Sequence, residues 1–217
     1  MATKYRAVLF DLDGTLADTL ADLGNAMNWA LKQLGCPIHF IDSYRHKVGE
    51  GNRALCARAL PEDRQGLVDE AMRLMRDRYS EHCFDETRLY PGIAELVTSL
   101  AQRDYKLAVL SNKRDEFTKR VIEHYFDPSP FAVVRGQLPG VPLKPDPAAA
   151  LQIASELGVP PEEWLYLGDT NTDMRTARAA GMHPVGVLWG FRDRRELEES
   201  GSEMVIAAPQ ELLEMLD

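Results

Sequence analysis

The sequence predicts an α/β fold: a Rossmann-like parallel sheet with helices on both faces, plus an inserted all-helical domain. Three observations predict it. Short, continuous apolar runs recur along the chain, as expected for strands that are buried on both faces. Segments with helical spacing of apolar residues alternate with these runs, which favours a parallel sheet. The long interval between the first and second runs holds helical patterns and no strand-like run, which predicts the insertion.

The predicted strands are the apolar runs themselves, and the first of them is separated from the rest. It covers residues 6–10, whereas the second begins only at Leu107. The remaining strands follow at the shorter intervals that a connecting helix requires. They cover residues 107–110, 131–134, 164–167, 185–188 and 204–206.

The predicted helices carry apolar side chains every three or four residues, and several end at a glycine, which is a common helix stop. In the sheet domain they cover residues 93–100, 117–125, 151–157 and the segment from Thr170 to Gly181. In the insertion they cover residues 20–34, 54–60 and 67–79. We therefore expect a core domain of residues 1–15 and 86–217, and a helical domain of residues 16–85.

Composition and charge exclude several classes of protein. The chain has 217 residues and a net charge of −9, which disfavours binding to nucleic acid or to an anionic membrane. Its three cysteines show no C-x-x-C spacing and fit a reducing compartment. The apolar stretch near the start is too short for an export signal, and no stretch approaches the ~20 residues of a membrane span. We expect a cytoplasmic protein.

Two carboxylates, Asp11 and Asp13, follow the first predicted strand. The carboxyl end of a strand is where open α/β sheets bind ligands. Such a pair can share a metal ion, or divide the roles of nucleophile and acid. Gly14 gives the backbone the freedom to turn sharply after them. A polar turn without chemistry explains the same pattern equally well.

Two further segments are weak signals when taken alone. Ser111 and the two residues after it follow the second strand, where a hydroxyl and loop amides suit phosphate oxygens, although most such pairs form ordinary turns. In a later loop, Pro147 suits a first helical turn and Asp146 suits its cap. These structural roles do not explain Lys144, which could neutralise a bound anion or lie on the surface.

The fourth signal is a second pair of carboxylates, Asp169 and Asp173, where another strand runs into a helix. Their spacing of one helical turn lets both face one point, although an acid at a helix start is also a good cap. With Asp11 and Asp13, four carboxylates meet at one edge of the sheet and would repel each other without a cation. Oxygen ligands suggest a hard cation, most simply Mg²⁺.

These segments, in this order and spacing, resemble the motifs of the haloacid dehalogenase superfamily over nearly the whole chain. Residues 11–19, DLDGTLADT, are similar to the first motif. Ser111, Lys144 and the Asp169/Asp173 pair match the second, third and fourth motifs; threonine is common in the family where Ser111 stands. Within the superfamily, the chain is similar to the phosphoglycolate phosphatases.

The resemblance implies a Mg²⁺-dependent phosphatase that works through an aspartyl-phosphate. Asp11 would be the nucleophile, and Asp13 would be the general acid and then the general base. The carboxylates of Asp11 and Asp169 and the backbone carbonyl of Asp13 would hold the metal, with Asp173 in support. Lys144 would offset the charge of the phosphoryl oxygens. The residues expected to bind phosphate or substrate are Gly14, Thr15, Ser111, Asn112, Lys113, Gly49, Gly51, Asn52 and Arg45.

The helical insertion resembles the cap domain that part of the superfamily inserts between its first two motifs. Residues 48–52 look like the cap loop that phosphoglycolate phosphatases turn toward the substrate. The cap would close over the site and exclude water. The predicted partner is a small phosphate ester, most simply 2-phosphoglycolate, whose carboxylate needs a cation such as Arg45, Lys47, Arg53 or Lys113. We expect a monomer or a homodimer.

Several alternatives stay open. A phosphatase or pyrophosphatase of other substrate preference, or a phosphosugar mutase, would use the same family motifs. A haloalkanoate dehalogenase shares the attacking carboxylate, but has no use for Asp13 or for the Asp169/Asp173 pair. A signalling receiver domain is also phosphorylated on an aspartate, but lacks a large cap and the second aspartate two residues on.

Overall fold

The computed structural model describes residues 5–216, and its centre is a six-stranded parallel sheet. The strand order is β5-β4-β1-β6-β7-β8, and every neighbouring pair is parallel. All the strands predicted from apolar runs are present. They are β1 (Ala7–Phe10), β4 (Lys106–Arg114), β5 (Val133–Gln137), β6 (Trp164–Gly168), β7 (His183–Val187) and β8 (Met204–Ile206).

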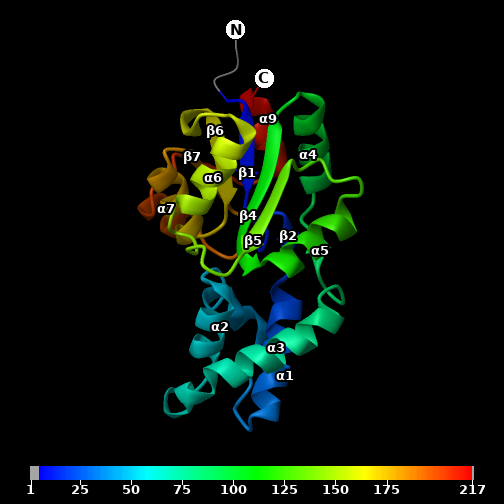
Figure 1. The fold of residues 1–217 in the computed structure, drawn as a ribbon, viewed down its shortest axis with the longest axis vertical. Helices are drawn as coiled ribbons and strands as arrows, with labels where there is room; N and C mark the ends of the chain where they lie inside the picture. Colours follow the sequence, from blue (N-terminus) through cyan, green and yellow to red (C-terminus); the bar gives the residue numbers. More distant parts are fainter. Residues whose placement is uncertain (1–4, 217) are drawn as a thin grey trace.

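Helices cover both faces of this sheet (Figure 1). The alternation of side chains along β1 shows why the strand is apolar throughout: Val8 and Phe10 pack into one hydrophobic cluster, and Ala7 and Leu9 into another. Helices α4 (Ile93–Gln102), α5 (Asp115–Tyr125) and α9 (Pro209–Leu216) contribute to the first cluster. Helices α6 (Ala148–Leu157) and α7 (Asn171–Ala180) contribute to the second. The short helix α8 (Arg194–Glu199) lies between β7 and β8 in the sequence.

Residues 20–82 form three α-helices with a hydrophobic cluster of their own. Leu23, Met27 and Leu31 line one side of α1 at helical spacing and pack there with Leu55 and Met75. Figure 1 shows these helices together at one end of the sheet. They are α1 (Leu20–Gln33), α2 (Gly51–Ala59) and α3 (Val68–His82), with 3₁₀ turns η1 (Ile41–His46) and η2 (Glu62–Leu67) between them.

The two chain segments that lead into and out of this helical segment pair with each other. They form a short antiparallel ribbon of β2 (Ala17–Asp18) and β3 (Arg88–Leu89). The sequence did not predict this ribbon, because two residues are too few to show an alternating pattern. Ala17 still packs into a cluster of the sheet, whereas Leu20 is the first residue of the helical cluster.

Two local expectations were wrong. The second strand was expected to end at Leu110, but β4 continues to Arg114 because Arg114 pairs with Gln137 of β5 beyond an irregularity in the register. Pro147 was expected inside the first helical turn, but α6 begins at Ala148. The carboxylate of Asp146 nevertheless accepts a hydrogen bond from the Ala148 amide at 2.9 Å, as expected of a cap.

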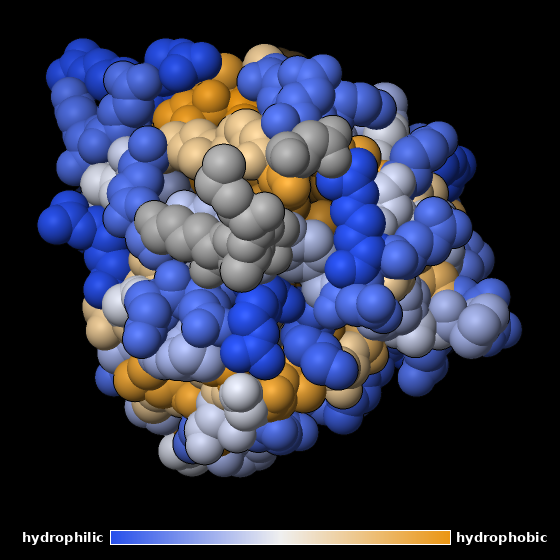
Figure 2. Space-filling view, turned by 90° about the horizontal axis from the view of Figure 1, so that it is seen from above, coloured by the Kyte–Doolittle hydropathy of each residue, from blue (hydrophilic) through white to orange (hydrophobic). Residues whose placement is uncertain are grey.

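The topology places the carboxyl ends of the central strands beside the helical segment. From β1 the chain passes to β4 and β5 on one side of it, then to β6, β7 and β8 on the other. The reversal of direction at β1 is the switch point at which open α/β sheets bind ligands. Helix α9 and the start of β1 lie at the opposite end of the molecule, whose surface is mostly hydrophilic (Figure 1 and Figure 2). No helix in residues 5–216 is long and apolar enough to cross a membrane.

Candidate active site

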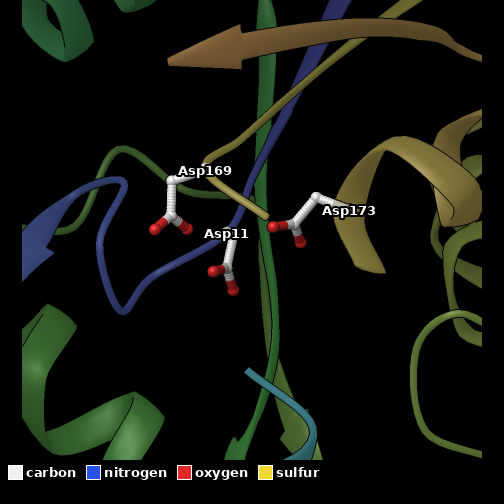
Figure 3. Close-up of side chains that lie close together, drawn as sticks. All are labelled: Asp11, Asp169 and Asp173. Carbon is white, nitrogen blue, oxygen red and sulfur yellow. The ribbon is translucent and has the colours of Figure 1, made fainter. Parts of the chain in front are cut away.

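Three buried carboxylates meet at the carboxyl end of the central strands. Asp11 directly follows β1, Asp169 directly follows β6, and Asp173 lies in the first turn of α7. Figure 3 shows the three side chains gathered around one space, and one oxygen from each lies within 4.8 Å of the others. The sequence predicted this convergence from the strand ends and from the spacing of one helical turn between Asp169 and Asp173.

Glycines allow the backbone to approach these carboxylates closely. Gly14 adopts a φ of 91°, and a Cβ on it would lie 2.2 Å from Oδ2 of Asp169. A Cβ on Gly168 would lie 2.2 Å from the Cβ of Asp173. Both distances are far below contact distance, so larger residues would displace the acids. The sequence indicated a role for Gly14 but not for Gly168, because the spacing between Gly168 and Asp173 gives no signal of contact.

Lys144 lies at the centre of the acidic group and uses all three of its ammonium hydrogens there. Its Nζ donates to Oδ1 of Asp11 at 2.8 Å, to Oδ1 of Asp173 at 2.7 Å and to the Leu110 carbonyl at 3.0 Å. Its side chain is only 3% exposed. Lys144 is therefore a buried cation that joins three elements of the sheet domain.

The other oxygens of the acids are largely held by neighbouring groups. Oδ2 of Asp169 accepts from the Phe191 amide at 2.8 Å, and the Thr15 hydroxyl points at its Oδ1 from 3.4 Å. Oδ2 of Asp173 accepts from the amide and the hydroxyl of Thr170, in a capping box that begins α7. Among the described residues, Oδ2 of Asp11 has no hydrogen-bond partner.

The electrostatics of the site fit a bound cation. Burial raises the pKa of Asp11 to about 7 against the pull of Lys144, and the charges of Asp173 and Asp13 add to the rise. Burial and the neighbouring carboxylates likewise raise the pKa of Asp169 well above its usual range. One lysine does not balance these acids, and an oxygen-only set of ligands suits a hard divalent cation.

Asp13 lies beside this group, but its carboxylate belongs to a different set of contacts. Oδ1 accepts from the Thr19 hydroxyl at 2.6 Å and from Nζ of Lys113 at 2.9 Å, and Oδ2 is 3.1 Å from the same Nζ. Burial lowers the pKa of the Lys113 ammonium group, but the Asp13 carboxylate and the Tyr79 side chain together raise this pKa by more, so that it lies above its usual range. The sequence analysis did not identify Thr19 as a contact of Asp13.

A small cleft separates the sheet domain from the helical segment. Its volume is about 30 Å³, which is room for water but not for a phosphate ester. Most of the residues predicted to bind substrate line it, and Leu23, Val48 and Leu55 add an apolar wall. Its other lining residues are Asp11, Asp13, Gly49, Gly51, Asn52, Ser111, Asn112 and Lys113.

Asn112 connects both sides of the cleft. Its Nδ2 donates to the Gly49 carbonyl at 2.9 Å and to the Lys144 carbonyl at 3.0 Å, and its Oδ1 accepts from the Lys144 amide. The Ser111 hydroxyl accepts a hydrogen bond from the amide of Lys113 at 3.2 Å. These contacts fix the end of β4 and the loop before α2 relative to each other.

The cations expected from the helical segment do not line the cleft. Arg45 donates to Asp42 and to the Gly190 carbonyl, and Arg53 pairs with Asp69 on an exposed surface. Nζ of Lys47 lies 3.5 Å from the Ser43 carbonyl. Of the candidates for a carboxylate-binding cation, the structure brings only Lys113 to the cleft.

Comparison with known proteins agrees with this geometry. The family model for haloacid dehalogenase-like hydrolases matches residues 8–187. The chain therefore belongs to the haloacid dehalogenase-like hydrolases. The matched range contains the strands and acids of the site and the helical segment between them.

Similar proteins in this family carry the name phosphoglycolate phosphatase. The protein from Nitrosospira multiformis is 34% identical over 225 residues, covering 97% of this chain and 95% of its own length. The protein from Aquifex aeolicus is 32% identical over 217 residues, covering 98% and 97%. The chain is thus a phosphoric monoester hydrolase that resembles the phosphoglycolate phosphatases.

Solved structures show the same fold. A protein from Lactobacillus delbrueckii subsp. bulgaricus superimposes with a TM-score of 0.92 at 31% identity, with 98% of each chain covered. A hydrolase from Pseudomonas syringae gives a TM-score of 0.76 at 25% identity, again with 98% of each chain covered.

Proposed function

We propose that this protein hydrolyses a small phosphate monoester through an aspartyl-phosphate on Asp11, and that 2-phosphoglycolate is the preferred substrate. The observation that carries the proposal is the placement of two different carboxylates, Asp11 and Asp13, on one cleft. Asp11 has one oxygen held by Lys144 and one without a partner among the described residues. The similarity to phosphoglycolate phosphatases supports the choice of substrate.

In the first step, an oxygen of Asp11 attacks the phosphorus. The bond between phosphorus and the ester oxygen breaks, and that oxygen leaves as an alkoxide that takes a proton from Asp13. Water then attacks the phosphorus of the aspartyl-phosphate, Asp13 accepts a proton from it, and the bond to Asp11 breaks. The products are an alcohol and inorganic phosphate, and both carboxyl groups return to their initial states.

The residues that would hold a divalent cation are Asp11, Asp169 and Asp173, with the backbone carbonyl of Asp13, and we propose Mg²⁺ as the ion. When bound, the cation supplies positive charge to the phosphoryl oxygens as they develop charge. Lys144, in the loop between β5 and α6, adds a second positive charge. The Ser111 hydroxyl is the proposed hydrogen-bond donor to phosphate. The amides of Gly14 and Thr15, which were expected to bind phosphate, instead donate to the carbonyls of Ala17 and Leu12 at 2.9 and 3.3 Å.

We propose that residues 16–85 act as a cap over this site. The cleft of about 30 Å³ is too small for the substrate, so binding requires the cap to move away from the sheet and to close again. In the closed state, Asn52 and the start of α2 face the acids. The amide side chain of Asn52 and the N-terminal end of α2 suit the carboxylate of a short ester such as 2-phosphoglycolate.

The test is phosphate release from 2-phosphoglycolate, several sugar phosphates, pyrophosphate and p-nitrophenyl phosphate, with Mg²⁺ and with EDTA. We expect release that requires Mg²⁺, is fastest with 2-phosphoglycolate and falls by at least about 10³-fold in Asp11→Asn. The matched control is Asp104→Asn, which makes the same change near the start of β4, at the other end of the sheet, and should retain activity.

Each other outcome contradicts a different part of the proposal. Full activity in Asp11→Asn would refute the aspartyl-phosphate. Fastest release from another ester would refute 2-phosphoglycolate as the substrate and leave the mechanism in place. Transfer of phosphate between sugar hydroxyls without release would identify a phosphosugar mutase.

A further inference from the structure

Helix α3 brings an aromatic ring onto the lysine that holds Asp13. Nζ of Lys113 lies 4.7 Å from the centre of the Tyr79 ring, close enough for a cation–π contact. Lys113 belongs to the sheet domain and Tyr79 to the helical segment. The contact therefore joins the two parts of the molecule directly beside the site.

The Lys113 ammonium group is almost fully removed from water, with a side-chain exposure of 2%. Such a group needs a partner for each of its donors. Nζ donates to the two carboxylate oxygens of Asp13, Oδ1 at 2.9 Å and Oδ2 at 3.1 Å. The face of the Tyr79 ring is the remaining partner, because it carries partial negative charge. The ring thereby helps to fix the position of Nζ, which in turn fixes the Asp13 carboxylate.

Tyr79 is itself held rigidly. It ends a buried stripe of α3 that includes Ala71 and Met75, and its ring meets Phe117 of α5 edge-on at 5.2 Å. The C-terminal half of α3 accordingly lies next to α5 in Figure 1. The Tyr79 hydroxyl is buried and makes no hydrogen bond of normal geometry, but its interaction with the ammonium group helps to raise the pKa of Lys113. The whole Tyr79 side chain therefore faces Lys113, and its ring makes the cation–π contact.

We propose that Tyr79 is a positioning residue for the reaction, which acts through Lys113 to hold Asp13 where it can protonate the leaving oxygen. The inference rests on the proposed function, in which Asp13 is the acid. It assigns a role to a residue of α3 that lies outside every motif of the sequence. Tyr79 touches no reacting atom and is not a catalytic residue.

The role of Asp13 as an acid gives a test that depends on the leaving group. The alkoxide leaving group of 2-phosphoglycolate needs a proton, whereas the p-nitrophenolate of p-nitrophenyl phosphate leaves without one. Displacement of Asp13 should therefore slow the first ester far more than the second. We expect Tyr79→Leu to lower kcat for 2-phosphoglycolate by about 10–100-fold and kcat for p-nitrophenyl phosphate by less than about 3-fold. Tyr79→Phe keeps the ring and should retain the wild-type ratio of the two rates.

The matched control is Tyr44→Leu. Tyr44 is buried in the same hydrophobic cluster, but its hydroxyl donates to Asn28, away from Lys113. Loss of packing alone should change the two rates by the same factor, as expected for this control. Should Tyr79→Leu fail to fold, Lys113→Met removes the same support from Asp13. Because Lys113 is also a candidate partner of the substrate carboxylate, this variant is compared on a sugar phosphate, which has an alkoxide leaving group but no such carboxylate, and on p-nitrophenyl phosphate. It must show the same dependence on leaving group.

Equal losses on both esters in Tyr79→Leu, or no loss on either, would overturn the inference. If the wild-type protein prefers another alkyl ester, that ester replaces 2-phosphoglycolate and the expected ratio is unchanged. Absence of phosphate release by the wild-type protein would instead refute the proposed function.

Discussion

Replacement of Lys144 by methionine tests whether the acids are stabilised by one buried cation. The substitution keeps most of the side-chain volume but leaves Asp11 and Asp173 without their shared partner. The two ion pairs measure 2.8 and 2.7 Å, and the carboxylate side chains are 9% and 1% exposed. Removal of one member of such a buried pair costs about 3–5 kcal/mol, because the remaining charge is uncompensated.

The assay is urea unfolding in EDTA, so that no cation replaces the lysine. With a slope of about 2 kcal/mol/M, the expected loss lowers the unfolding midpoint by about 1.5–2.5 M. The control is Lys119→Met, which removes an ion pair of 2.7 Å from a lysine that is 51% exposed. An exposed pair contributes about 0.5 kcal/mol, or about 0.3 M in midpoint. A midpoint in Lys144→Met no lower than in this control would refute the reasoning.

Two further predictions concern the cation and the junction between the sheet and the helical segment. Burial raises the pKa of Asp11 to about 7 in the folded protein, above its ordinary value of 3.8. In the metal-free protein, the proton that Asp11 retains therefore stabilises the fold. This contribution is complete below pH 3.8 and is lost as the pH rises through 7. Mg²⁺ competes with that proton and should raise Tm more at pH 8 than at pH 5.5. Equal increases in Tm at the two pH values, measured by thermal unfolding, would contradict this prediction. Asp22, which is buried, accepts hydrogen bonds from the amides of Glu86 and Thr87 and from the Thr87 hydroxyl. Asp22→Asn should cost about 1.5–3 kcal/mol and lower Tm by about 3–12 °C. The control Asp69→Asn removes only an exposed ion pair with Arg53 and should lower Tm by less than about 2 °C.

Much of the fold was predictable because regular elements leave periodic patterns in the sequence. Every side chain of β1 is buried, so the strand is a continuous apolar run. Helix α1 buries one side only, so its apolar residues recur every three or four positions. The ribbon of β2 and β3 was not predictable, because its pairing depends on two segments that are about 70 residues apart and too short to carry a pattern.

The acidic part of the site was also predictable. Asp11 and Asp169 directly follow strands, and the carboxyl ends of parallel strands lie at one edge whatever the details of packing. Asp173 follows by one helical turn, which is fixed by helix geometry. The sequence by itself therefore determined that Asp11, Asp169 and Asp173 meet. It was wrong to place the Asp13 carboxylate in the same group, because that carboxylate contacts Thr19 and Lys113 instead.

Only the tertiary structure decided where the long side chains point. Arg45 was expected at the substrate but donates to Asp42 and to the Gly190 carbonyl, while Tyr79, which no motif indicated, packs against Lys113. A long side chain can reach partners in many directions, and its choice depends on neighbours distant in the chain. Backbone periodicity fixes where a side chain starts, and packing between domains fixes where its charged end lies.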